Sequence, residues 1–164
     1  MITTLRKAHD IAASVTDPEM PMLTLEDLGV LRSVSLEDDH VVVTITPTYS
    51  GCPAMATMRD DLVHRLADHG LRAIVRVSLM PAWSSDWITP RGRAALTAHG
   101  ISAPLDARGS GPVAISLRPT RRDLVCLRCG SAEVELSSEF GPTACKAMYR
   151  CTSCQESFEH VKEI

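Results

Sequence analysis

Residues 46–54 join an extended pattern to a helical pattern, and they read Thr46-Pro47-Thr48-Tyr49-Ser50-Gly51-Cys52-Pro53-Ala54. Residues 41–45 alternate in the way typical of a strand with one better buried face. Pro47 ends that strand because it has no N–H for a ladder. Gly51 permits a tight turn, and Pro53 has the φ favoured in the first turn of a helix. We therefore predict strand, turn and helix in that order, with Cys52 at the helix cap.

A thiol at the cap of a helix lies over backbone N–H groups that have no partner within the helix. Such a position lowers the pKa of the thiol and favours thiolate, the form that acts as nucleophile or metal ligand. The alternative is a buried and inert side chain, because free cysteine is among the most buried residue types. Both interpretations of Cys52 stay open on the residues alone.

The composition is that of a globular protein, with 45% hydrophobic and 23% charged residues in 164. A chain of this length can form one ordinary domain and a small appendage. No run approaches the roughly 18 apolar residues that cross a bilayer, and the amphipathic start lacks the pattern of an export signal. We expect a cytoplasmic protein with no membrane partner.

The first hundred residues alternate between helical and extended patterns. Residues 1–15 have helical spacing, residues 30–36 and 41–45 suit a hairpin, and residues 55–70 suit a second helix before a strand at 74–79. A strand, helix and strand in that order imply a right-handed crossover. We therefore predict an α+β fold, in which a small mixed sheet with helices precedes a small β zinc ribbon.

An acidic loop bracketed by prolines, Asp17-Pro18-Glu19-Met20-Pro21, follows the first predicted helix. The carboxylates of Asp17 and Glu19 are available for chemistry. The alternative is a solvated turn, which is what most such loops are.

The chain divides where its periodicity stops. Residues 101–112 are rich in proline, glycine and serine, as linkers are. We predict a metal or iron–sulfur assembly type of domain at 1–100, a linker at 101–112 and a ribbon at 113–164.

The ribbon contains two Cys-x-x-Cys units separated by 21 residues, Cys126 with Cys129 and Cys151 with Cys154. That spacing is close to the roughly 15 to 20 residues of a four-cysteine zinc site. Four thiolates close a tetrahedron around Zn²⁺ and leave no open position for catalysis. A module with so few apolar side chains needs a metal to fold. Rubredoxin-type iron is the chemical alternative.

Cys145 lies six residues before the second cysteine pair and is left over from this set. Three roles stay open for it, namely a buried side chain, a redox-active thiol, or a substitute ligand.

The charge balance argues against nucleic acid as a partner. The chain carries a net charge of −3, and the segment from Pro112 onward has seven basic and seven acidic residues. Phosphate binding normally shows a basic stripe, and no such stripe is visible in the sequence.

Five stretches together resemble the PaaD family, the D proteins of the bacterial phenylacetate degradation operon, and the resemblance runs through nearly the entire chain. They are Asp17–Pro21, Asp27–Gly29, Thr46–Ala54, Thr89–Arg93 and Phe140–Ala147. The first domain is similar to the wider SufT-like iron–sulfur assembly family, whose members carry a comparable acidic loop and a strand-to-helix cysteine.

The resemblance implies an accessory protein of ring-1,2-phenylacetyl-CoA epoxidase, a multicomponent oxygenase. Its expected partners are the di-iron oxygenase subunits and the reductase that bears flavin and a [2Fe–2S] cluster. The implied role is maturation of one of these iron centres. By resemblance, Cys52 is the transient iron or cluster ligand, Asp17 and Glu19 assist it, and Thr48 and Ser50 shape the loop. The family's ribbon cysteines match Cys126, Cys129, Cys151 and Cys154, and Cys145 lies in a motif of its own.

Three functions compete at this point. The first is a non-enzymatic assembly factor, and the second is a structural subunit of the oxygenase. The third is a cysteine-dependent enzyme, which needs a base within hydrogen-bond reach. His64 and His69 lie well beyond Cys52 on the predicted helix, with no obvious orienting carboxylate. Self-association is left open.

Overall fold

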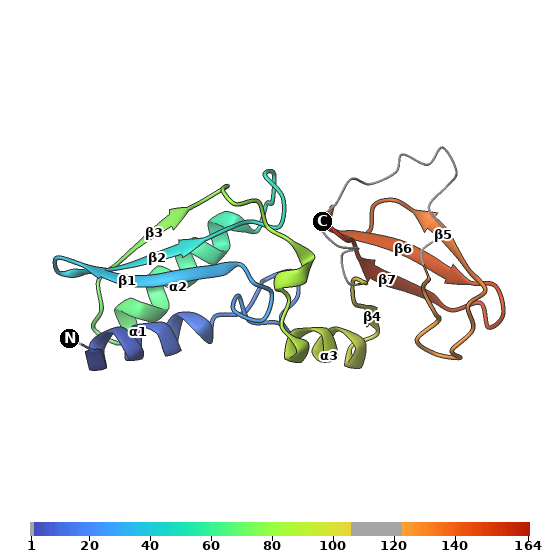
Figure 1. Ribbon diagram of the computed structural model, residues 1–164, viewed down its shortest axis with the longest axis horizontal. Coiled ribbons are helices and arrows are strands. Elements are labelled where there is room, and N and C mark those ends of the chain that lie inside the picture. The colour runs from blue at the N-terminus through green and yellow to red at the C-terminus, as the bar shows by residue number, and fades with distance from the viewer. Residues whose placement is uncertain (1, 106–122) are drawn as a thin grey trace.

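The computed structural model describes residues 2–105 and 123–164, and it has an α+β fold, as predicted. Two sheets lie side by side along the long axis, the first at the left of Figure 1 and the ribbon at the right. The C-terminus lies between them.

The first sheet is mixed, as the crossover argument predicted. β1 (Leu31–Glu37) pairs antiparallel with β2 (His40–Ile45), and β3 (Ala73–Val77) pairs parallel with β2. The strand order is β1-β2-β3. β2 is therefore the central strand, and its carboxyl end leads directly into the loop that contains Cys52.

Two helices complete this domain. α1 (Ile2–Ala13) and α2 (Met55–Asp68) contact each other and the sheet. Met58, Leu62 and Leu66 form the buried face of α2 and join one core with Val43 and Ile45 of β2. The helical period and the strand period therefore meet in a single apolar layer.

A carboxylate connects the region before β1 to the third helix, α3 (Pro90–Ala98). Asp27 Oδ1 accepts hydrogen bonds from Thr89 Oγ1 at 2.7 Å and Arg91 Nε at 2.9 Å, and Oδ2 accepts one from Thr24 Oγ1 at 3.0 Å. Burial raises the pKa of Asp27, but these bonds and the Arg91 charge outweigh it and hold the pKa below its usual value. Two of the motifs used for the family resemblance, Asp27–Gly29 and Thr89–Arg93, are thus in direct contact.

The second sheet contains the ribbon. β5 (Val134–Ser138), β6 (Lys146–Cys151) and β7 (Ser157–Val161) are antiparallel. β4 (Ile101–Ser102) pairs parallel with β7 and gives the order β4-β7-β6-β5. The first two residues of the predicted linker are therefore a strand of the ribbon sheet. Its part from residue 106 onward lies outside the described residues, and the division into domains stays a prediction.

A buried histidine fastens β7 to β4. His160 is 0% exposed, with Nδ1 3.0 Å from Ser102 Oγ and Nε2 2.9 Å from Glu163 Oε1. Glu163 Oε1 also accepts a hydrogen bond from the Leu105 N–H. Burial raises the pKa of Glu163, but the bonds from His160 and Leu105 outweigh it and bring the pKa to about 2.

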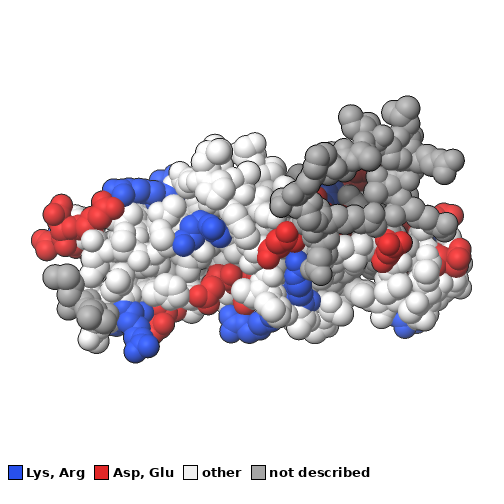
Figure 2. All heavy atoms as spheres, in the orientation of Figure 1, with Lys and Arg blue, Asp and Glu red and all other residues white. Residues whose placement is uncertain are grey.

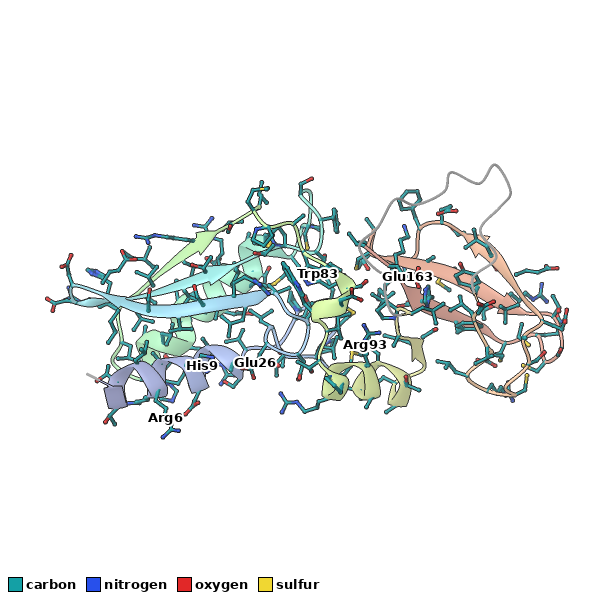
Figure 3. The ribbon with its side chains drawn as sticks, viewed as in Figure 1. Arg6, His9, Glu26, Trp83, Arg93 and Glu163 are labelled. Atoms are coloured by element: carbon teal, nitrogen blue, oxygen red, sulfur yellow. The ribbon has the colours of Figure 1, made fainter. Side chains whose placement is uncertain are left out.

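The end of the chain also returns to the first domain. Ile164 exchanges hydrogen bonds with Ser85 of the short helix η1 (Ser85–Trp87), and Val161 belongs to the main core. Figure 3 places Arg93 of α3 and Glu163 at this junction. The ribbon is thus docked on the first domain.

Gly29 offers a sharp test of the packing around η1. It has φ +73°, and a Cβ there would lie 2.5 Å from Trp87 Cβ. We expect Gly29→Ala to lower the free energy of unfolding by about 2 to 5 kcal/mol, from backbone strain and a steric clash together. Gly70→Ala is the matched control, since Gly70 has φ +75° with nothing within 4 Å.

The control removes only the advantage of glycine at positive φ and is expected to cost about 1 to 2 kcal/mol. Urea denaturation of the two variants measures the difference. Equal losses in both would contradict the close approach of Gly29 to Trp87.

Candidate functional site

The loop after β2 carries Cys52 through a turn, and the helix begins later than predicted. The Cys52 N–H donates to the Tyr49 carbonyl at 3.2 Å, and the Met55 N–H donates to the Cys52 carbonyl at 3.3 Å. Ala54 is the N-cap of α2, with no side-chain hydrogen bond at the cap. The prediction that Cys52 caps the helix is therefore wrong, because a further turn separates it from the first helical residue.

The predicted lowering of the Cys52 pKa is also wrong. Burial raises the pKa of this half-buried thiol, and the charges of Asp17, Cys145 and Glu19 raise it further. The Ala54 N–H opposes these effects and does not outweigh them. The helix terminus is too far away to supply the set of N–H groups that the sequence argument assumed.

Cys52 faces an enclosed cavity of about 20 Å³, which has room for about one water-sized occupant. Of the residues predicted for this site, Asp17, Glu19, Thr48 and Cys52 line the cavity, whereas Ser50 is exposed and does not. Cys145 lines it from the ribbon. The remaining lining residues are Met20, Tyr49, Pro53 and Thr143.

The two carboxylates of the acidic loop behave differently. Asp17 is 4% exposed, and its Oδ1 accepts hydrogen bonds from the Glu19 and Met20 N–H groups, both at 2.8 Å. Burial raises the pKa of Asp17, while these two bonds and the Lys146 charge oppose the rise. Glu19 is exposed at the cavity rim. The loop is thus a solvated turn at Glu19 and a buried polar site at Asp17.

Cys145 is buried, and its position is the main feature that sequence reasoning missed. Its Sγ lies 3.1 Å from Thr143 Oγ1, and burial raises the pKa of this thiol. The adjacent Lys146 is 4% exposed, and its Nζ lies 2.6 Å from Glu159 Oε2. The motif at residues 140–147 marked Cys145, but nothing local to that motif indicates Cys52 as a neighbour.

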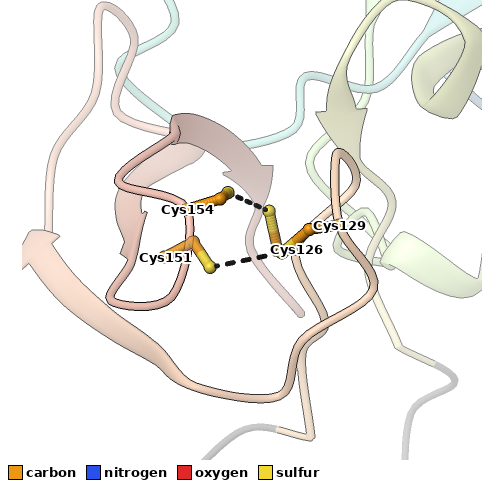
Figure 4. A group of neighbouring side chains, drawn as sticks. All are labelled: Cys126, Cys129, Cys151 and Cys154. Atoms are coloured by element: carbon orange, nitrogen blue, oxygen red, sulfur yellow. Dashed lines mark hydrogen bonds between the residues drawn. The ribbon is translucent and has the colours of Figure 1, made fainter.

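The four remaining cysteines form one cluster, as predicted (Figure 4). The sulfurs of Cys126, Cys129, Cys151 and Cys154 all lie within 4.8 Å of one another. The Gly130 N–H donates to the Cys126 carbonyl, and the Gln155 N–H donates to the Cys151 carbonyl, so each pair sits on a tight turn. The backbone N–H groups of Cys154 and Ser153 lower the pKa of Cys151 to about 6. The residues fit a four-thiolate metal site with no open position.

The surface carries charges of both signs. On the face drawn in Figure 2, acidic and basic side chains are interspersed, and no basic stripe crosses the described part of that face. None of the helices within residues 2–105 and 123–164 is long and apolar enough to span a bilayer.

Comparison with known families places both parts of the chain. Residues 110–162 match the model for the PaaD zinc beta ribbon domain, and residues 13–79 match the model for an iron–sulfur cluster assembly protein. The chain is also 40% identical over 162 residues to a relative from Escherichia coli (strain K12), covering 96% of this chain and 94% of the relative. The name of that relative makes it a putative subunit of 1,2-phenylacetyl-CoA epoxidase. This chain belongs to the PaaD family.

A solved structure supports the fold of the first domain. The crystal structure of domain of unknown function DUF59 from Bacillus anthracis aligns with a TM-score of 0.53 and 24% identity, over 58% of this chain and 92% of that one. This likeness shows the fold, and it agrees with the predicted SufT-like domain. The PaaD ribbon and the four clustered sulfurs together support a structural metal site.

We expect the purified protein to hold one tightly bound metal ion per chain in the four-cysteine cluster. The double variant Cys126→Ser, Cys129→Ser should lose this ion, and its ribbon should unfold, because the sulfurs replace a missing apolar core. Elemental analysis and circular dichroism measure the two effects. Cys145→Ser is the matched control and should keep the ion, whereas full metal content in the double variant would refute the site.

Proposed function

We propose that this PaaD-family protein is an accessory factor that matures an iron or iron–sulfur centre of a phenylacetyl-CoA epoxidase. One observation carries the proposal: within the segment that matches iron–sulfur cluster assembly proteins, Asp17 and Cys52 line the same enclosed cavity. The relative's name, which refers to a phenylacetyl-CoA epoxidase, supports the choice of client.

The cavity has the chemistry of a transient iron site. Iron is here the cargo of the protein, bound through the Cys52 thiolate and carboxylate oxygen and then passed on. A thiolate suits iron–sulfur chemistry, and a carboxylate suits harder ions. Asp17 is positioned by the backbone N–H groups of its own loop, while Glu19 at the rim can contact an ion as it enters. Thr48 and Ser50 shape the loop, Thr48 at the cavity and Ser50 at the surface.

The ribbon has a separate and structural role. We infer that its four thiolates hold Zn²⁺, since four clustered sulfurs favour zinc and leave no position for a substrate. The partners that follow from the family are the di-iron oxygenase subunits and the flavin and [2Fe–2S] reductase. A cytoplasmic location and the state of self-association stay predictions.

A structural subunit of the epoxidase is the second candidate, and the word subunit in the relative's name favours it. Purification of the epoxidase separates the two candidates. A structural subunit remains in the complex at a fixed ratio, whereas a maturation factor leaves an active enzyme behind.

A cysteine-dependent enzyme fits the geometry less well. The described residues that line the cavity include no histidine. His69 Nδ1 lies 2.8 Å from the Arg65 carbonyl, and both His64 and His69 are exposed. The Cys52 thiol therefore has no base of the usual kind among the described residues of its cavity.

Replacement of Cys52 tests the proposed function in cells. Cys52→Ser is nearly isosteric, but a hydroxyl is a poor ligand for iron at neutral pH, so the variant should accumulate as folded protein without supporting phenylacetate growth. The epoxidase isolated from these cells should lack iron or cluster, measured by elemental analysis. Cys52→Ala is the companion variant, because it removes both the thiol and any hydrogen bond.

The two variants separate a functional thiol from a packing one. Loss of folded protein in both would support the buried and inert interpretation of Cys52. Normal growth with normal epoxidase iron in both would exclude Cys52 as the functional centre.

A further inference from the structure

Two thiols from distant parts of the chain face the same small space. Cys52 belongs to the loop after β2, and Cys145 lies immediately before β6 in the ribbon, yet both line the 20 Å³ cavity together with Asp17. A space of this size has room for about one water-sized occupant. Three groups that commonly bind metals therefore surround a volume suited to one ion.

The electrostatic effects within the cavity show that these groups are close. Besides the dominant effect of burial, Cys145 and Asp17 each raise the pKa of Cys52, and Asp17 raises the pKa of Cys145. Lys146 is the cation that lowers the pKa of both Asp17 and Cys145, but its Nζ is already paired with Glu159 Oε2 at 2.6 Å. A bound cation would offset the remaining like charge.

The carboxylate has an oxygen to spare for such an ion. Among the described residues, both hydrogen bonds that Asp17 accepts go to Oδ1. These bonds hold the side chain in place from its own loop. Oδ2 is then the atom that can turn to an occupant of the cavity.

The backbone around Cys145 is held by residues at the end of β7. The Cys145 carbonyl accepts the Lys162 N–H at 2.9 Å, and Lys162 Nζ donates to the Ala144 carbonyl at 2.9 Å. β7 is in turn fastened to β4 through His160. The docking of the ribbon therefore determines where the Cys145 sulfur lies relative to Cys52.

We propose that Cys52 and Cys145 are paired thiolate ligands, joined by Asp17, of one divalent metal ion held between the first domain and the ribbon. Two thiolates with one carboxylate suit a borderline ion such as Fe²⁺, Co²⁺ or Zn²⁺. On binding, each thiol gives up its proton to water and forms one bond from sulfur to metal, without oxidation or reduction. The proposal rests on the proposed function for iron as the natural cargo.

Cobalt uptake by the full chain, with its four-cysteine site already filled, tests this site. Wild type should bind one Co²⁺ per chain beyond the ribbon metal, with the ultraviolet absorption of thiolate-to-cobalt charge transfer. Cys52→Ser and Cys145→Ser should each weaken binding by about a hundredfold or more, because loss of even an outer-sphere partner costs about 10- to 100-fold. Met20→Leu, which removes a thioether from the same cavity, is the matched control and should bind as wild type does.

A second measurement avoids any dependence on how the variants fold. In wild type, bound cobalt should protect both Cys52 and Cys145 from alkylation, as read by mass spectrometry of peptides. Protection of Cys52 alone, together with unchanged uptake by Cys145→Ser, would overturn the paired site and leave the proposed function standing. Uptake unchanged in both cysteine variants would count against the paired site and against Cys52 as the carrier.

Discussion

The parallel pairing of β4 with β7 is the constraint on which the functional geometry depends. It spans only Ile101 and Ser102, but His160, which pairs with Ser102, is fully buried with both ring nitrogens in hydrogen bonds. A buried polar group with all its partners specifies one arrangement, because any shift leaves it unsatisfied in a medium of low dielectric constant. The pairing therefore places the ribbon on the first domain in a single register.

The metal site of the ribbon supports that constraint from the other side. The apolar cluster of the ribbon has four buried members among the described residues, Leu124, Ala147, Tyr149 and Phe158. So small a core does not stabilise four strands on its own, and the thiolate cluster supplies the difference. Loss of the structural metal should therefore disturb β6 and β7, and with them the segment that carries Cys145. The structural and the transient site are thereby connected within one chain.

The parts of this structure that depend on local pattern could be predicted from the sequence. The mixed sheet followed from alternation and from the spacing of α2, and the ribbon cysteines followed from two short motifs. The contact of Cys145 with the Cys52 cavity could not be predicted, because it depends on how two domains dock across a segment without periodicity. The direction of the Cys52 pKa shift was wrong for a related reason, since burial by distant residues outweighed the local backbone. Strand β4 was missed because two residues are too few to show a period.

The most direct measurement of the central claim is anomalous X-ray diffraction from crystals of the full chain loaded with cobalt. The account predicts two anomalous peaks per chain, one within the four-cysteine cluster and one between the sulfurs of Cys52 and Cys145 beside Asp17. A single peak at the ribbon cluster, or a second peak that contacts only one of these two sulfurs, would contradict it.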